Sequence, residues 1–152
     1  MIRLSKLADY GIVISTHLAR HADRQQTALE IAAATSVPSP MASKILKLLV
    51  RSGTLASHRG ARGGYSLARP AAQVTVAEVI EALDGPIALT SCLDPGPGDC
   101  GLSELCPARA NWQRINHAIR DALAGVSLAE MAHTIPPAFL LPGERQPINA
   151  PL

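Results

Sequence analysis

Apolar residues recur at helical spacing in the first third of the chain. The positions that share one face between residues 5 and 20 are Leu7, Ala8, Gly11, Ile12, Ser15, Leu18 and Ala19. A repeat of three and four residues predicts an amphipathic helix, and Ser5 is placed to cap its N-terminus. A capping-box pattern from Thr27 to Glu30 predicts a second, shorter helix that continues through Ile31.

A third helix is predicted after the short turn at residues 36–38. Ser39 followed by Pro40 is typical of an N-cap and a first helical position, and the pattern ends at Gly53. The apolar positions expected to form its buried stripe are Met41, Ile45, Leu48 and Leu49.

The pattern changes between Gly53 and Pro70. Residues 54–58 and 65–68 are short strand-like runs, and the glycine-rich segment 59–64 joins them. This order predicts a β-hairpin. Three helices followed by a hairpin is the order of a winged helix-turn-helix, so we expect a mainly α fold with a small β-hairpin wing.

The second half is predicted to contain three further helices. Capping boxes at Thr75–Glu78 and Ser127–Glu130 begin a helix ending near Gly85 and a short later helix. A long helix is expected from about Ser103 to Gly125. Its apolar positions are Ala108, Trp112, Ile115, Ile119 and Ala122, spaced four, three, four and three residues apart. That spacing is typical of a seam that packs against another helix.

These elements divide the chain into four segments. We expect a DNA-binding winged helix-turn-helix at 1–84 and a cysteine-rich loop at 85–108. A dimerisation helix with a short C-terminal helix is expected at 103–135, and a proline-rich tail at 136–152 is expected to be extended or disordered.

Composition excludes several classes of protein. Aromatic residues are 3% of the 152, too few for a stacking platform for single-stranded nucleic acid. No run of 18 apolar residues suits a membrane span, and the N-terminus shows no secretory signal, which predicts a cytoplasmic protein without a membrane partner.

The formal net charge of +2 conceals an asymmetry. Residues 1–75 hold ten Lys and Arg against three Asp and Glu, a net charge of +7. Residues 76–152 hold four against nine, a net charge of −5. A polyanionic partner for the first half is the natural interpretation, and a chance excess of solvated charge is the alternative.

The basic residues fall where a winged helix-turn-helix meets double-stranded DNA. On the third predicted helix a basic stripe lies opposite the apolar one, and two serines lie near the N-terminus that enters the major groove. The hairpin tip places arginines among glycines, which suits a narrow minor groove. The predicted DNA-binding residues are Ser39, Ser43, Lys44, Lys47, Arg51, Arg59 and Arg62. Each alone is compatible with a solvated face or a tight turn, and their joint placement favours DNA.

All three cysteines lie within fifteen residues, at Cys92, Cys100 and Cys106. Cysteines that serve as core residues are expected at scattered positions, whereas a glycine- and proline-rich loop can wrap a metal centre. The centre could be an iron–sulfur cluster, a zinc ion or a thiol redox switch. The absence of a CxxC pair disfavours zinc without excluding it.

The chain resembles the Rrf-two family of bacterial transcription regulators, which IscR, NsrR and RirA typify. The resemblance covers about residues 1–135. It rests on the opening at residues 1–10, the turn 59–65, the segment 76–80 and three cysteines before a long helix. The opening is most similar to the branch that regulates the SUF pathway of iron–sulfur assembly. The resemblance implies a winged-helix homodimer with a 2Fe–2S or 4Fe–4S cluster on the three cysteines.

Several positions depart from the family pattern. Ser43 stands where IscR has a glutamate, so its DNA preference need not transfer. The interval from the first to the second cysteine is two residues longer than in IscR. Arg109 stands where IscR has a histidine ligand. In NsrR-like members an acidic residue near the partner's N-terminus completes the cluster, and Asp9 stands at that position.

We therefore predict that Asp9 of one subunit ligates the cluster of the other. The alternative is that Asp9 pairs with Lys6 or caps the first helix. Weaker ligand candidates are His17, His21, Glu104 and His117.

The function predicted from the sequence is a dimeric DNA-binding regulator that senses iron–sulfur status and controls iron–sulfur assembly genes. A zinc- or thiol-based regulator is the first alternative, and a small carrier that delivers clusters is the second. An enzyme is not expected, because no motif places a nucleophile beside a base.

Overall fold

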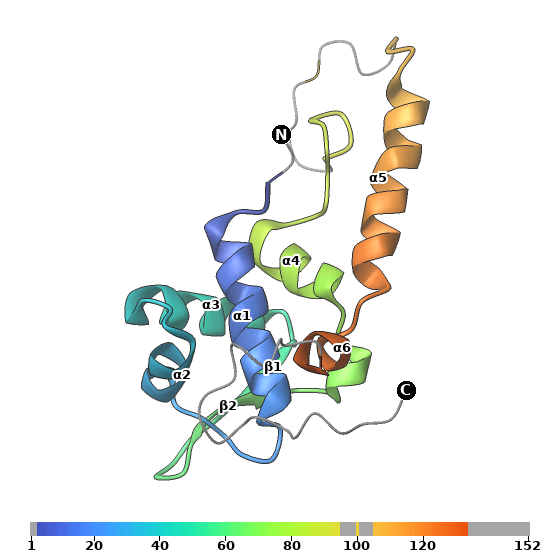
Figure 1. Cartoon of the computed structure of the whole chain (residues 1–152). Helices are drawn as coiled ribbons and strands as arrows, with labels where there is room; N and C mark the ends of the chain where they lie inside the picture. Colours follow the sequence, from blue (N-terminus) through green and yellow to red (C-terminus); the bar gives the residue numbers. More distant parts are fainter. Residues whose placement is uncertain (1–2, 95–99, 101–104, 134–152) are drawn as a thin grey trace, which may run out of the picture.

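The structure is a computed structural model that describes residues 3–94, 100 and 105–133. The elements in chain order are α1 (Lys6–Arg20), α2 (Ala28–Thr35), α3 (Ser39–Arg51), β1 (Leu55–His58), β2 (Gly64–Leu67), the 3-10 helix η1 (Ala71–Gln73), α4 (Val76–Asp84), α5 (Arg109–Ala124) and α6 (Leu128–His133). Three helices followed by a hairpin confirm the predicted winged helix-turn-helix (Figure 1).

One apolar core joins helices that are far apart in the sequence. Ile14 of α1, Ile31 of α2, Ile45 of α3, Val79 of α4 and Leu128 of α6 have no solvent exposure and belong to one cluster. Burying each such side chain contributes about 1.5–3 kcal/mol relative to leaving it in water. The position of α3 is therefore fixed by packing from several sides.

The three predicted capping boxes, Thr27–Glu30, Thr75–Glu78 and Ser127–Glu130, are confirmed. In the first, the Glu30 amide donates to Thr27 Oγ1 at 3.3 Å, and the Thr27 amide donates to Glu30 Oε2 at 2.7 Å. Ser5 is also confirmed as the N-cap of α1, since its hydroxyl accepts from the Ala8 amide at 3.0 Å. The starts of α1, α2, α4 and α6 are thus set by local sequence.

Two details of the predicted helices were wrong. Ser39 is the first residue of α3 rather than its N-cap, because Pro38 takes the cap position with an extended ψ of 131°. The Ala42 amide donates to the Pro38 carbonyl at 2.9 Å, so the helix begins one residue early. The buried stripe of α3 also includes Ala42 and Leu46, while Met41 and Leu48 are only half-buried.

The wing is a two-stranded antiparallel hairpin that pairs Leu55 with Leu67 at its base and His58 with Gly64 at its far end. Its turn is closed by a hydrogen bond from the Gly63 amide to the Gly60 carbonyl at 2.9 Å. At Gly60 φ is +108°, a conformation that residues with a side chain rarely adopt. The glycines therefore permit the tight tip that the sequence predicted.

The second half differs from the prediction at the start of its long helix. The helix expected from Ser103 begins instead at Arg109, because Pro107 lacks an amide proton and disfavours helical geometry at Cys106. The short helix α6 returns to the main core, with a β-bridge between Thr75 and Ser127. Ser103 itself and the predicted tail lie outside the described residues.

The chain has two distinct ends, and α1 runs between them. Figure 1 shows the wing tip at one end, while the loop at residues 86–94 and the N-terminal end of α1 lie at the other. The α5 helix stands beside α4 along one edge of the molecule. Within the described ranges, no helix is long and apolar enough to span a membrane.

Candidate nucleic-acid interface and cysteine region

The α3 helix presents a basic face to solvent. Lys44, Lys47 and Arg51 are exposed, while Ile45 and Leu49 between them have no exposure. The apolar side of α3 is packed into the core, so the cationic side is held outward in a fixed orientation. A helix built this way can enter the major groove of DNA with its charged side facing the bases and phosphates.

The N-terminal turn of α3 carries the small polar residues of the predicted site. Ser39 is exposed and Ser43 is half-buried. Among the described residues neither hydroxyl has a hydrogen-bond partner. Both hydroxyls are therefore available to a phosphate or a base edge.

Arg59 and Arg62 are exposed on either side of Gly60 in the wing turn. The turn projects beyond the helices (Figure 1). Behind it, the imidazole of His58 shares a hydrogen bond with the Ser66 hydroxyl across the two strands at 2.9 Å. The two guanidinium groups thus extend from a hairpin that is braced close to its tip.

The wing is held at Tyr65, one residue from the far end of the strand pairing, by a residue that the sequence analysis missed. Gln26, in the loop between α1 and α2, is 1% exposed and forms a β-bridge with Tyr65 of β2. Its side-chain Oε1 is hydrogen-bonded by Nε2 of His17 at 2.8 Å. Burial lowers the pKa of His17, although its hydrogen bond to Gln26 acts in the opposite direction. An isolated glutamine in a polar loop carries no signal that would have identified this contact.

The three cysteines are half-buried free thiols. Cys92 lies at the end of the loop after α4, where its sulfur shares a hydrogen bond with the Thr90 hydroxyl at 3.2 Å. Cys106 lies three residues before α5. Within residues 3–94, 100 and 105–133, no three His, Cys, Asp or Glu side chains are grouped as a metal site. Glu104, one of the weaker ligand candidates, lies outside these residues.

A cavity of about 390 Å³ lies between the loop at residues 86–94, which carries Cys92, and helix α5. Its lining residues are Cys92, Leu93, Asp94, Arg109, Gln113, Asn116 and His117. Asn116 fixes the loop to the helix, because its side chain donates to the Ile87 carbonyl at 2.8 Å and accepts from the Leu89 amide at 3.0 Å. The structure therefore brings His117 and Arg109 to the same cavity as Cys92.

The other predicted ligand residues lie on α1. Asp9 is exposed and has no hydrogen bond or ion pair from its side chain among the described residues. Ser5 caps α1, so Asp9 is not its cap, and among the described residues Asp9 forms no ion pair with Lys6. His17 and His21 lie near the opposite end of α1 with their rings 4.4 Å apart, and His17 is engaged by Gln26.

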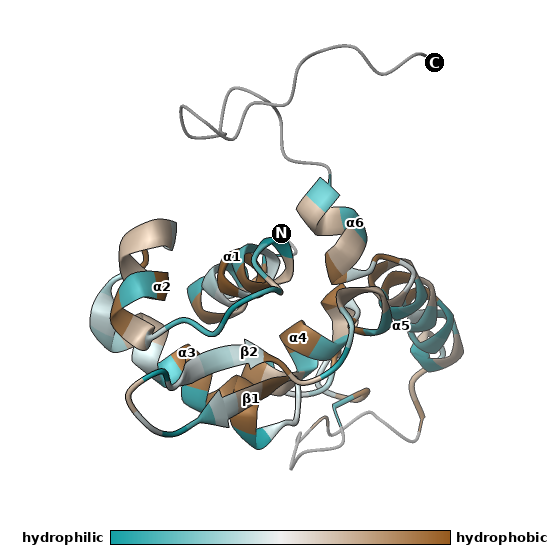
Figure 2. Ribbon diagram, turned by 90° about the horizontal axis from the view of Figure 1, so that it is seen from below, coloured by the Kyte–Doolittle hydropathy of each residue, from teal (hydrophilic) through white to brown (hydrophobic). Residues whose placement is uncertain are grey.

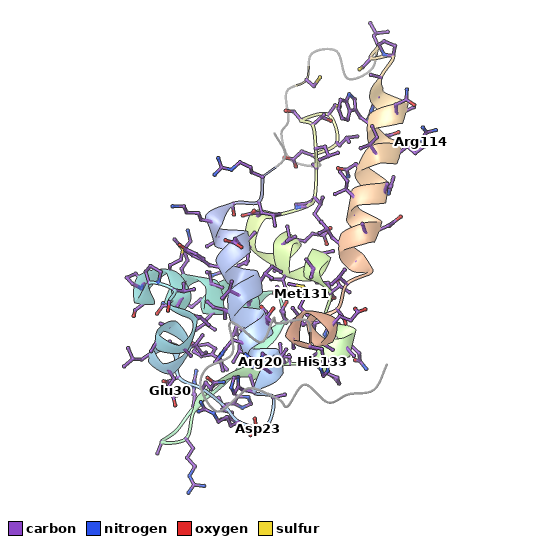
Figure 3. All side chains as sticks on the ribbon, viewed as in Figure 1. Arg20, Asp23, Glu30, Arg114, Met131 and His133 are labelled. Atoms are coloured by element: carbon purple, nitrogen blue, oxygen red, sulfur yellow. The ribbon has the colours of Figure 1, made fainter. Side chains whose placement is uncertain are left out.

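The α5 helix contributes no buried residue to the chain. Its predicted seam includes Trp112 at 40% exposure and Ile115 at 44%. Elsewhere on the helix, Arg120 forms an ion pair with Glu81 of α4 at 2.8 Å. Figure 2 shows apolar and polar positions together on this edge helix, and Figure 3 shows Arg114 pointing away from the rest of the chain. An apolar strip on α5 is thus left uncovered.

Comparisons with known proteins agree with this architecture. A family described as Rrf2, an iron-dependent transcriptional regulator, matches residues 4–134. An HTH-type transcriptional regulator of Mycobacterium tuberculosis is 33% identical over 133 residues, which cover 86% of this chain and 81% of that protein. The HTH-type transcriptional regulator IscR of Xenorhabdus nematophila is 28% identical over 131 residues, covering 86% of this chain and 79% of IscR.

Solved structures give the same result. CymR, described as the global cysteine regulator of B. subtilis, superposes with a TM-score of 0.71 at 25% sequence identity. The match covers 90% of this chain and 100% of the CymR chain. The relatives found in sequence and in structure are transcription regulators rather than enzymes.

Proposed function

Since this chain belongs to the Rrf2 family of DNA-binding transcription regulators, we propose that it is a homodimer that senses iron–sulfur status. A cluster held by Cys92, Cys100 and Cys106 is the proposed sensor, and iron–sulfur assembly genes are the proposed targets. Binding to chromosomal DNA implies that it acts in the cytoplasm. The observation that carries the proposal is the separation of a basic α3 and wing from a half-buried set of three free thiols.

The proposed contact with DNA uses α3 and the wing together. Lys44 and Lys47 would lie along the major groove, with Ser39 and Ser43 at the helix end that enters first. Arg59 and Arg62 would reach the adjacent minor groove or its phosphates. Support comes from the exposure of every charged group in this set. On α3, these groups lie opposite side chains that are fully buried.

The proposed dimer forms through α5. Trp112 and Ile115 form an apolar strip that the chain leaves uncovered, and a second copy of the same helix would bury it. Two α3 helices related by a two-fold axis would then read half-sites about one DNA turn apart. A near-palindromic operator follows from that symmetry.

The thiol donor set fits an iron–sulfur cluster chemically. Three free cysteines supply the soft ligands that iron–sulfur clusters require, and none is used in a disulfide. When bound, a cluster supplies chemistry that responds to iron supply and to oxidants. An arginine side chain does not ligate iron, so Arg109 leaves the fourth ligand to another residue. Thr90 is placed to donate a hydrogen bond to the Cys92 sulfur.

Asp9 of the partner subunit is the fourth ligand we propose. Its carboxylate is exposed near the N-terminus of α1, and among the described residues it makes no competing contact. An Asp9 held by the other protomer would connect α1 to that protomer's cysteine loop. Because α1 also carries His17, which contacts the Gln26 that pairs with the wing, this one helix would connect the cysteine loop to the wing.

The proposal predicts that DNA affinity depends on the state of the cysteines. Anaerobically purified protein and the same protein after iron removal are titrated against the gene's own upstream DNA by fluorescence anisotropy. A coupling of about 1–3 kcal/mol corresponds to a change in Kd of roughly 5- to 150-fold. Equal Kd values for the two preparations would contradict sensing through this site.

A thiol-based regulator is the second candidate. The likeness to CymR, described as a cysteine regulator, supports it. In that case the same three thiols would respond to oxidation directly. Iron, sulfide and zinc analysis separates the two, because only the cluster requires stoichiometric iron and sulfide.

A further inference from the structure

The wing packs on the core through Leu55, and its second strand is also paired with a buried residue outside the hairpin, Gln26. The Gln26 amide donates to the Tyr65 carbonyl at 3.1 Å, and the Tyr65 amide donates to the Gln26 carbonyl at 2.7 Å. Tyr65 in turn pairs with Ser57 across the hairpin. Gln26 therefore acts as a one-residue third strand, and it ties the hairpin to the corner between α1 and α2.

The contact is a direct approach of two backbones. A Cβ atom added to Gly64 would lie 2.5 Å from the Gln26 carbonyl oxygen and 2.6 Å from its carbonyl carbon. No side chain larger than hydrogen fits there without displacing the loop. A small shift of Gln26 must consequently move β2, the strand that leads out of the turn carrying Arg59 and Arg62.

The Gln26 side chain is held from α1. His17 Nε2 lies 2.8 Å from Gln26 Oε1, and the neutral Nε2–H tautomer donates this bond. The Gln26 Nε2 group is buried and has no hydrogen-bond partner in the described part of the chain. Hence the His17 ring is the side-chain contact that sets the orientation of the Gln26 amide.

We propose that Gln26, oriented by His17, is a positioning residue for DNA binding that sets the angle of the wing and thereby the contribution of Arg59 and Arg62. This inference rests on the proposed contact of the wing with DNA. Gln26 is itself buried and does not touch DNA. Its substitution should matter only while the wing arginines are present to be misplaced.

A double-mutant cycle tests this dependence. Gln26→Leu is made in the wild-type chain and in the Arg59→Ala/Arg62→Ala chain, and Kd for operator DNA is measured by anisotropy from about 50 to 200 mM salt. We expect Gln26→Leu to weaken binding about 5- to 10-fold. Each lost phosphate contact lowers the salt slope by about 0.9, so we expect a decrease of about one to two. In the arginine-less chain the same substitution should change neither quantity.

Two controls separate positioning from loss of folding. Gln25→Leu alters the exposed neighbour in the same loop and should leave Kd and salt slope unchanged. His17→Leu keeps the backbone bridge but removes the donor, and it should reproduce the Gln26→Leu defect. His17→Gln keeps a hydrogen-bond donor at this position, which His17→Leu lacks, and should bind DNA with the Kd and salt slope of the wild type. Thermal unfolding of each variant checks that the folded state is populated.

The outcomes distinguish this inference from the proposed function. A salt slope lowered by the arginine substitutions but unchanged by Gln26→Leu and His17→Leu would overturn the positioning role and leave the wing contact intact. Equal losses from Gln26→Leu with and without the arginines would also overturn it, because a general destabilisation is additive. A wild-type slope in the Arg59→Ala/Arg62→Ala chain would overturn both the wing contact and the inference.

Discussion

The proposed DNA-reading end (α1, α2, α3 and the wing) and the cysteine end (the 86–94 loop, Cys106 and α5) are built in opposite ways. In α3 the side chains of Ala42, Ile45, Leu46 and Leu49 are fully buried, α1 and α2 begin with side-chain caps, and the wing is bridged to the α1–α2 corner. In α5 no residue is fully buried, and no three ligand-type side chains are grouped as a metal site in the described residues. The first end is packed within one chain, whereas the proposed function has the second end completed by a cluster and a second subunit.

The largest expected effect tests the packing that holds α3 in place. Leu46 of α3 has no solvent exposure, so Leu46→Ala should lower the free energy of unfolding by about 2–5 kcal/mol. Leu29 of α2 is 72% exposed, and Leu29→Ala should change it by less than about 0.5 kcal/mol. Urea unfolding followed by circular dichroism measures both. Similar losses for the two variants would contradict the packing described for α3.

The next prediction tests whether a second copy of α5 covers the apolar strip formed by Trp112 and Ile115. Ile115→Glu places a charge in the apolar seam and should make the protein monomeric if the proposed α5 dimer is formed by the wild type. Loss of paired half-site binding should weaken DNA affinity by about 100-fold. Arg114→Glu, one position away on the outward side (Figure 3), should remain dimeric. Sedimentation equilibrium reports the mass of each variant. An Ile115→Glu variant that remains dimeric would contradict the proposal that this seam is the dimer interface.

At the DNA-reading end, Arg59→Ala should lower the salt slope of binding by about 0.9 and weaken affinity several-fold. Arg69→Ala is the matched control, because Arg69 is already paired with Glu78 at 3.0 Å. Anisotropy titrations at four salt concentrations give both slopes. If the two variants have the same slope as the wild type, Arg59 makes no contact with DNA.

At the cysteine end, Asp9→Ala should shift the visible absorption of the anaerobic protein or shorten its lifetime in air. The effect is expected because a lost ligand exposes iron to solvent and oxygen. Asp23→Ala, an equally exposed carboxylate near the other end of α1, should do neither. An unchanged spectrum and lifetime in Asp9→Ala would remove Asp9 from the ligand set.

The smallest expected effect is a pH dependence of stability caused by His17, which contacts the residue that pairs with the wing. Burial lowers the pKa of His17, so the unfolded chain binds a proton there more readily than the folded one. Stability from this group is present above about pH 6.5 and declines as pH falls through that value. Urea midpoints from pH 8 to 5.5 should decline more steeply for wild type than for His17→Gln. Urea midpoints that decline in parallel for wild type and His17→Gln would contradict a lowered pKa of His17 in the folded state.

Local signals in the sequence predicted most of the DNA-reading end. Capping boxes such as Thr27–Glu30 and the turn glycines act through neighbouring residues, so their outcome is visible in the sequence. The start of α3 was misplaced by one residue because Pro38 and Ser39 compete for the cap. The bridge of Gln26 to Tyr65 was missed because it joins residues 39 positions apart through backbone atoms.

The cysteine end was less predictable for a physical reason. The sequence identifies three thiols and an apolar seam, but which groups meet depends on tertiary contacts. Asn116, for example, fastens the 86–94 loop to α5 by two hydrogen bonds that no local pattern signals. The ligand roles of Asp9 and the three cysteines remain predictions from the family resemblance, and His117 is placed beside Cys92 only by the fold.

The central claim is that the cysteine end is completed by an iron–sulfur cluster. The most direct test is the absorption spectrum of the protein purified without oxygen, with iron, sulfide and zinc determined on the same sample. We predict a coloured protein with charge-transfer absorption in the visible region and stoichiometric iron and sulfide, all lost in Cys92→Ser. A colourless protein that contains zinc, or no metal, would contradict the claim.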